Sequence, residues 1–275
     1  MAGELDLDAY FERIGYGGDG RPTLDTLASL HALHAEAIPF ENLSVFLRED
    51  VPLDLASLQA KLVAAERGGW CFEHNLLFAH VLRGLGFALR TLAARVIWTA
   101  APNEVRPRSH MLLQLQLPDG DHIADVGFGG LGLTAPLRLP GDTGQQTTDA
   151  PFRLTQPTQG NYLLEAQVAG DWEDLYVFDL HEQTLPDYEV SNWYLANHPK
   201  SYFVNGIMAA RAEPGARHAL RNLRHAIHRP GMPTESRAIE SVEDLRKTLS
   251  GPFRIRLPDT PELDRRFARL FADPP

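Results

Sequence analysis

Residues 67–75 read Arg-Gly-Gly-Trp-Cys-Phe-Glu-His-Asn, and this stretch sets the local structure around the single cysteine of the chain, Cys71. The paired glycines allow the backbone to turn tightly, and the apolar residues that follow recur at helical spacing. The pattern predicts a helix over 71–85 that is closed by Gly86. Cys71 is therefore expected in the first turn of a helix.

A thiol at the start of a helix is in a position that favours its ionisation and its use as a nucleophile. The N-terminal end of a helix carries partial positive charge, which favours the thiolate over the thiol. Most free cysteines are instead buried and inert, and it is the flanking motif that favours a nucleophile at Cys71. With one cysteine in 275 residues no intramolecular disulfide can form, so a reducing compartment is the natural setting.

Outward from this motif the character of the chain changes. Leucines recur every three or four residues from Leu5 to Gly86, which is typical of a helical bundle. Short apolar stretches then predict strands at Thr91–Ile97, Met111–Leu117, His122–Val126, Phe152–Leu154, Tyr162–Val168 and Leu175–Leu180, a sheet or barrel signature. The rest predicts a small α/β unit after a connecting helix, with a helix at Ser191–Phe203, strands at Ile207–Arg211 and Arg217–Ile227, and an amphipathic helix at Ser241–Leu249.

Two further residues are candidates for a catalytic triad with the Cys71 thiol. A thiolate that transfers an acyl group needs an imidazole to share its proton and an acidic group to orient that imidazole. His110 immediately precedes a predicted apolar strand, and Asp125 ends the next one after the turn at Asp119-Gly120. A hairpin would bring the two side chains together. The chain has 11 histidines, however, so spacing alone does not single out His110.

Four short motifs follow one another along the chain: IPFENL at Ile38–Leu43, RGGWCFEHN at Arg67–Asn75, SHMLL at Ser109–Leu113 and DVGFGG at Asp125–Gly130. Together they resemble the arylamine N-acetyltransferase family, closely over the first half of the chain and more loosely beyond it. By position, the resemblance implies a nucleophilic Cys71, a general base at His110 and an orienting acid at Asp125. This triad would be arranged as in cysteine proteases and transglutaminases.

The resemblance also implies a fold and a reaction. The expected class is α+β: residues 1–86 form a helical bundle with the nucleophile, 87–190 a β-barrel with the histidine and aspartate, 191–206 a connecting helix and 207–275 an α/β lid. In this family acetyl-coenzyme A acetylates the cysteine, which passes the acetyl group to an aromatic amine or hydrazine in a double-displacement cycle. Acetyl-coenzyme A is then a co-substrate, and no metal is expected.

Substrate contacts follow from the same resemblance. Phe40, Phe128 and Phe203 match aromatic positions that line the acceptor pocket of the family, although a core phenylalanine is an equal alternative for each. Gly127, Gly129 and Gly130 would give the pantetheine arm of coenzyme A close access to the backbone, and an ordinary turn is their plain alternative.

Charged residues near these motifs suggest two more contacts. We expect Arg67 and Glu41 to form a buried ion pair, because both charges lie inside apolar motif segments. The basic stretch Arg217 to Arg229 could approach the phosphates of coenzyme A, although a solvated strand face is the favoured interpretation.

Composition excludes several other classes. The formal net charge of -10 would repel a polyanion, so neither nucleic acid nor an anionic membrane is expected as a partner. The acidic stretch from Met1 to Asp8 lacks the features of a secretory signal, and charges interrupt the greasiest region, Asn75 to Ala101, so it cannot span a bilayer. A cytoplasmic protein is predicted, and its oligomeric state stays open.

Three alternatives remain beside the acetyltransferase. An amide synthase of the same family would keep the triad and take an acyl chain from a carrier protein. A binding protein on this fold that has lost catalysis is a second alternative, which the intact triad disfavours. A metal site is the third and weakest, because His31 with His34, and Cys71 with His74, sit three residues apart without a recognised zinc spacing.

Overall fold

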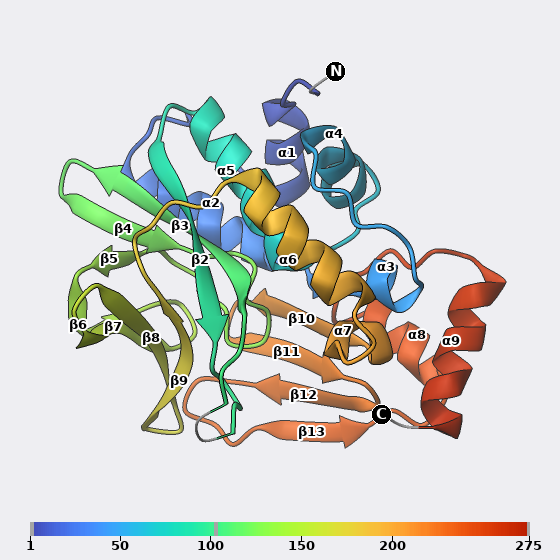
Figure 1. Ribbon diagram of the computed structural model, residues 1–275. Helices are drawn as coiled ribbons and strands as arrows, with labels where there is room; N and C mark the ends of the chain where they lie inside the picture. The colour runs from blue at the N-terminus through green and yellow to red at the C-terminus, as the bar shows by residue number, and fades with distance from the viewer. Residues whose placement is uncertain (1–2, 102–103, 274–275) are drawn as a thin grey trace.

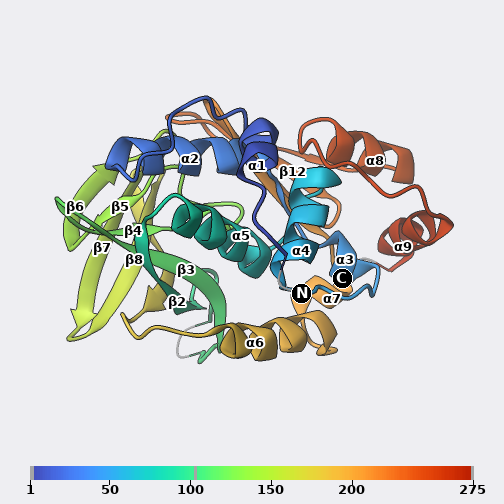
Figure 2. The same cartoon turned by 90° about the horizontal axis from the view of Figure 1, so that it is seen from above.

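The helix that begins at Cys71 lies at the centre of an N-terminal helical bundle. The computed structural model describes residues 3–101 and 104–273; residues 1, 2, 102, 103, 274 and 275, which fall in the predicted segments 1–86, 87–190 and 207–275, lie outside that description. The bundle and the short strand within it comprise α1 (Leu7–Ile14), α2 (Leu24–Ala37), β1 (Phe40–Glu41), α3 (Leu43–Phe46), α4 (Leu55–Leu58), the π-helix η1 (Gln59–Ala64) and α5 (Cys71–Gly84). Side-chain oxygens of Asp6 and Thr23 accept backbone N–H groups at the starts of α1 and α2. Figure 2 shows α2 and α1 lying over α5.

The middle of the chain forms an eight-stranded antiparallel sheet that curls into a nearly closed barrel (Figure 1). Its strand order is β5-β4-β3-β2-β9-β8-β7-β6, so the two edge strands are consecutive in sequence and lie next to each other. The strands are β2 (Ala88–Val96), β3 (Arg108–Leu117), β4 (Gly120–Ala124), β5 (Leu137–Leu139), β6 (Gly141–Gln146), β7 (Pro151–Thr158), β8 (Asn161–Val168) and β9 (Asp171–Phe178). Each of the six predicted strands overlaps one of these.

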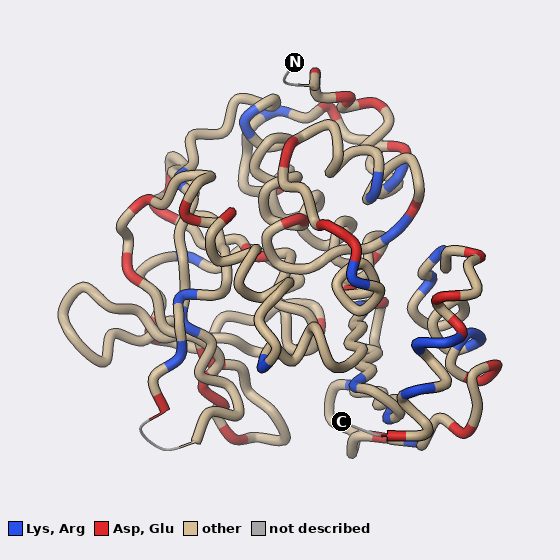
Figure 3. Tube along the Cα trace, turned by 45° about the vertical axis from the view of Figure 1, so that its right-hand side comes forward, with Lys and Arg blue, Asp and Glu red and all other residues tan. Residues whose placement is uncertain are grey.

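A second antiparallel sheet, in the order β1-β10-β11-β12-β13, closes the other side of the molecule. Its edge strand β1 comes from the N-terminal bundle, where Phe40 pairs with Ala210 and Glu41 with Ala209. This pairing holds the IPFENL segment between the bundle and the C-terminal unit. The remaining elements are β10 (Met208–Glu213), β11 (Ala216–Arg221), β12 (Arg224–His228), β13 (Glu235–Ala238), α8 (Val242–Ser250) and α9 (Pro261–Ala272). Basic and acidic residues alternate along the two helices (Figure 3).

Two sequence predictions in this part were wrong in detail. The connecting helix was expected at Ser191–Phe203, but α6 spans Leu185–Asn197 because Thr184 and Asp187 cap its start, and a separate short helix α7 spans Tyr202–Asn205. The single strand expected at Arg217–Ile227 is a hairpin of β11 and β12. It turns at Asn222, which adopts a left-handed φ of 52°.

Candidate active site

The turn before α5 brings two segments of backbone unusually close. A side chain at position 68 would place its Cβ 2.0 Å from the carbonyl oxygen of Pro39, so only glycine fits there. Gly69 forms a parallel bridge with Phe40, and its carbonyl accepts the Glu41 N–H at 2.8 Å. Cys71 follows as the first residue of α5 with 7% of its surface exposed, as the motif predicted for its place in the helix.

His110 lies within β3, between the carboxylate and the thiol. Its Nε2 donates to Oδ2 of Asp125 at 2.6 Å, and Cys71 is close enough to the ring to raise its pKa, while the Cys71 thiol donates to the Ser109 carbonyl at 3.7 Å. Burial alone lowers the pKa of His110, but the charge and the hydrogen bond of Asp125, together with the neighbouring Cys71, outweigh burial and raise that pKa to about 10. The imidazole is therefore a cation at neutral pH.

Asp125 is fully buried at the end of β4 and accepts four hydrogen bonds. Besides His110, the donors are Tyr176 Oη at 2.9 Å, Asn75 Nδ2 at 2.9 Å and the Gly127 N–H at 2.9 Å. Burial alone raises the pKa of Asp125, but the His110 charge and the hydrogen bonds from His110, Asn75 and Gly127 hold it below its usual range. The carboxylate stays ionised and fixes the ring that it accepts from.

Two polar residues of this network were not predicted from the sequence. Asn75 follows Cys71 by one helical turn, and its amide also donates to the Met111 carbonyl while its oxygen accepts the Val126 N–H. The i, i+4 spacing from Cys71 is a signal that could have identified it. Tyr176 comes from β9, more than 50 residues after Asp125, and no local pattern marks it.

The three predicted aromatic residues gather around the triad. The Phe128 ring meets the His110 ring edge-on with centroids 5.2 Å apart. The ring centroid of Phe203 lies 6.4 Å from that of Phe40 and 5.3 Å from that of Trp70, the residue before Cys71. All three phenylalanines are only partly buried. The three rings are aromatic neighbours of the triad and of Trp70, and their contact with a substrate stays a prediction.

The predicted glycines differ in what they allow. A Cβ on Gly127 would lie 2.7 Å from Cα of Cys71, so this glycine lets the loop pack against the start of α5. Gly129 has a left-handed φ of 87° and faces the Phe40 ring. A Cβ on Gly130 would have only the Trp98 ring within 4 Å, at 3.7 Å. Close packing therefore explains Gly127, and Gly130 has the most open surroundings of the three.

The predicted ion pair between Arg67 and Glu41 is confirmed. Arg67 Nε and Nη2 lie 2.8 and 2.7 Å from Oε1 of Glu41, whose side chain is 1% exposed. The other carboxylate oxygen accepts the Leu43 N–H at 2.6 Å. The pair ties β1 to the turn before Cys71.

Arg217, the first residue of the predicted basic stretch, lies inside the protein. It pairs with Asp149 at 3.2 Å and its side chain is 7% exposed. Its guanidinium also reaches the Gly130 carbonyl at 3.4 Å. Neither a solvated strand face nor a free phosphate ligand describes this arginine, because its charge is already matched by the Asp149 carboxylate.

The histidines weighed as metal ligands bond to other partners. His34 and His74 hydrogen-bond to each other at 2.9 Å, and His31 Nε2 accepts the Asp125 N–H at 3.2 Å. Within residues 3–101 and 104–273, no three His, Cys, Asp or Glu side chains are grouped to hold a metal ion. Nor does any helix of the described chain have the length and apolar character needed to cross a membrane.

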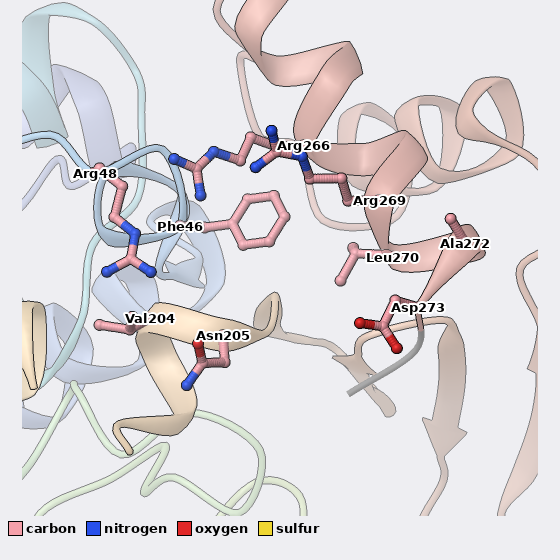
Figure 4. A pocket seen from close by; sticks show the side chains of 9 residues that line it. All are labelled: Phe46, Arg48, Val204, Asn205, Arg266, Arg269, Leu270, Ala272 and Asp273. Carbon is pink, nitrogen blue, oxygen red and sulfur yellow. The ribbon is translucent and has the colours of Figure 1, made fainter. Parts of the chain in front are cut away.

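Two of the cavities that the described residues form are lined by residues outside the triad. The larger, about 240 Å³, lies among α3, α7 and α9, with Arg48, Arg266 and Arg269 around an apolar floor that includes Phe46 (Figure 4). The smaller, about 30 Å³, is lined by Phe40, Gly129 and Arg217 among others.

Known proteins share both the sequence and this architecture. The family model described as N-acetyltransferase matches residues 23–262. Arylamine N-acetyltransferases of Mycobacterium bovis and Escherichia coli are 42% and 39% identical over 98% and 92% of this chain, and over 98% and 90% of their own lengths.

Solved structures agree with these relatives. The arylamine N-acetyltransferase of Mycobacterium marinum superposes with a TM-score of 0.92 at 39% identity, covering 96% of this chain and 99% of that one. Its complex with CoA gives the same TM-score at 38% identity and the same coverage. The predicted α+β fold and the resemblance are confirmed. On both kinds of evidence, the chain belongs to the arylamine N-acetyltransferase family.

Proposed function

We propose that this chain transfers an acetyl group from acetyl-coenzyme A to an aromatic amine or hydrazine through a thioester on Cys71. The observation that carries the proposal is the buried hydrogen bond from His110 to Asp125, with Cys71 close enough to the same ring to raise its pKa. A thiol, a charged imidazole and an ionised carboxylate in this order are what acyl transfer through sulfur requires. Relatives named arylamine N-acetyltransferase, and one such enzyme solved with CoA, support the donor and the acceptor class.

In the first half-reaction the Cys71 thiolate attacks the acetyl carbonyl carbon. The bond from that carbon to the coenzyme A sulfur breaks, and the His110 imidazolium donates its proton to the departing sulfur. The products are acetyl-Cys71, the thiol form of coenzyme A and a neutral His110. Asp125 holds the ring through Nε2, so that Nδ1 stays directed at the sulfur.

In the second half-reaction the acceptor nitrogen attacks the same carbon. Neutral His110 accepts the proton of that nitrogen, the bond to Cys71 sulfur breaks, and the thiolate is restored. Cys71 contributes to the raised pKa of His110 through its hydrogen bond and its charge. Acetylation removes that contribution, so His110 becomes easier to deprotonate at the step where it must act as a base.

Phe40, Phe128 and Phe203 would hold a flat acceptor by stacking, and their partial burial leaves ring surface for it. Gly127, Gly129 and Gly130 would border the pantetheine arm, with Gly130 the least hindered. We further propose the four-part division at 1–86, 87–190, 191–206 and 207–275, and the cytoplasm as the location.

Acetylation of the intact protein tests the function. After incubation with acetyl-coenzyme A, mass spectrometry should find one acetyl group on Cys71, and a Cys71→Ala variant should gain none. Addition of an arylamine should remove the acetyl group and yield the acetylated amine. A protein that acquires acyl groups only from a carrier protein would indicate an amide synthase, and a protein that stays unmodified would indicate a binding protein.

A further inference from the structure

Three polar side chains of the bundle form a continuous hydrogen-bonded series that the proposed reaction does not use. Tyr10 of α1, His34 of α2 and His74 of α5 are each 0% exposed. Tyr10 Oη lies 2.8 Å from His34 Nδ1, and His34 Nε2 lies 2.9 Å from His74 Nδ1. The helices that carry them lie together in Figures 1 and 2. We call these three residues the buried relay.

The relay ends on the two segments that shape the active site. His74 Nε2 lies 3.0 Å from the Gly69 carbonyl oxygen and 3.2 Å from the Pro39 carbonyl oxygen. Gly69 precedes Trp70 and the nucleophile, and Pro39 precedes Phe40. The Nε2 atom of His74 therefore contacts both the turn that precedes Cys71 and the segment that carries Phe40, a proposed acceptor-pocket residue.

The end of the relay fixes the direction of every proton in it. Carbonyl oxygens only accept, so His74 Nε2 must carry the proton that it shares between them. A neutral His74 then accepts at Nδ1 and receives the proton of His34 Nε2. His34 in turn accepts at Nδ1 from the Tyr10 hydroxyl. Each member thus donates towards the active site and accepts from the residue behind it.

No carboxylate takes part in these hydrogen bonds, so a protonated imidazole would lie in the interior without a charged hydrogen-bond partner; Glu41 favours the charge of His74 and Lys61 opposes it, and burial outweighs both. Burial lowers the pKa of His74 to about 4 and lowers that of His34 well below its usual value. Burial also raises the pKa of Tyr10, which keeps its hydroxyl as a donor. The neutral chain is the form that satisfies all of these groups at pH 7.

We infer that His74, oriented by His34 and Tyr10, is a positioning residue that holds the Phe40 segment in register with the Cys71 turn for acyl transfer to the acceptor. This inference rests on the proposed function. The ion pair of Arg67 with Glu41 and the bridge between Phe40 and Gly69 connect the same two segments. The N–H of His74 is the contact that reaches the backbone carbonyls of both Pro39 and Gly69. Its loss should affect acceptor binding more than the acetylation of Cys71, because Phe40 lies on the proposed acceptor side.

Imidazole tautomers give a first test that needs no substrate. Nitrogen–proton correlation spectra of the whole protein at pH 7 should show neutral rings with the proton on Nε2 for His34 and His74. His31 should show the opposite tautomer, because its Nε2 accepts the Asp125 N–H. A proton on Nδ1 of His74, or a doubly protonated His74, would overturn the relay. This result is independent of whether Cys71 carries acetyl groups.

Two variants at one position give the functional test. His74→Gln keeps one donor towards the carbonyls and one acceptor towards His34, whereas His74→Leu keeps neither. We expect His74→Leu to raise the KM for an arylamine about tenfold, the effect of losing one buried hydrogen bond, and to change the single-turnover rate of Cys71 acetylation by less than about threefold. His74→Gln should stay within about threefold of the parent in both. Equal behaviour of the two variants, or an equal loss in both half-reactions, would overturn the inference.

The assay also separates this inference from the proposed function. If the unmodified parent protein is not acetylated at Cys71, the proposed function fails while the tautomer result still decides the relay. If His74→Leu does not fold, the tautomers of the parent protein and the kinetics of His74→Gln remain measurable, and a large loss in His74→Gln would contradict the inference.

Discussion

His110 and His74 are both almost completely buried next to the Cys71 turn, yet their protonation differs. His110 meets an ionised Asp125 and has its pKa raised to about 10, whereas His74 meets two carbonyls and another imidazole and has its pKa lowered to about 4. Burial is the same in the two cases, so the hydrogen-bond partner decides the charge. Around a single helix, this fold therefore holds one charged hydrogen-bonded network and one neutral one.

Removing the ring of the charged network should have the largest effect. His110→Ala takes away the group that supplies and accepts the proton, so kcat/KM should fall by about a hundredfold to ten-thousandfold. Steady-state assays with a fixed arylamine measure the loss. Thermal unfolding should show that the variant remains folded, and near-normal turnover in a folded variant would refute the role of His110.

Asp125→Asn is expected to make the charged network resemble the neutral one. The amide keeps the shape but loses the charge that raises the pKa of His110, so this pKa should fall and the ring should be neutral at a lower pH than in the parent. We expect kcat to fall at least about tenfold to a hundredfold, since the imidazolium is no longer stabilised. Titration of His110 by NMR measures the pKa. An unchanged value would show that Asp125 does not control the ring.

The sequence allowed the charged network to be predicted better than the neutral one. Cys71, His110 and Asp125 lie in short motifs, and the predicted hairpin of β3 and β4 brings the last two together. His31 and Tyr176 contact Asp125 from α2 and β9, so only the folded packing joins them. The i, i+3 spacing of His31 and His34 suggested a metal, but the helix directs them to different partners.

The strands show the same limit. The predicted strand Met111–Leu117 had an apolar signal because Met111 to Leu115 are buried in the structure, whereas Gln116 is exposed. All four residues of β13 are exposed, so this strand carries no apolar pattern and was not predicted. The hairpin at Asn222 was missed because a left-handed turn on a non-glycine residue leaves little trace in the sequence.

The neutral network should make stability depend on pH. An unfolded His74 titrates near pH 6.5, whereas the folded ring has a pKa of about 4, so between these values the unfolded chain binds more protons. Stability should therefore fall as the pH drops from 7 towards 4, by about 2 kcal/mol from this residue at pH 5. Urea unfolding of the parent and of His74→Gln at pH 7 and pH 5 measures it. The stability of the parent relative to this variant should decrease by that amount, and a constant difference would contradict the neutral assignment.

The far end of the relay should give the smallest effect, and it distinguishes a directed chain from a set of separate contacts. Tyr10→Phe removes only the hydroxyl that donates to His34 Nδ1, which leaves one buried acceptor unpaired and should cost about 1 to 2 kcal/mol of unfolding free energy. Tyr16→Phe is the matched control: the Tyr16 hydroxyl makes one long contact, with the Gly20 N–H at 3.4 Å, and its loss should change stability by less than about 0.5 kcal/mol. Denaturant unfolding at pH 7 measures both. If Tyr10→Phe is no less stable than Tyr16→Phe, the hydroxyl does not donate into the relay. A directed neutral chain predicts this loss at Tyr10, because His34 must accept there in order to donate towards His74.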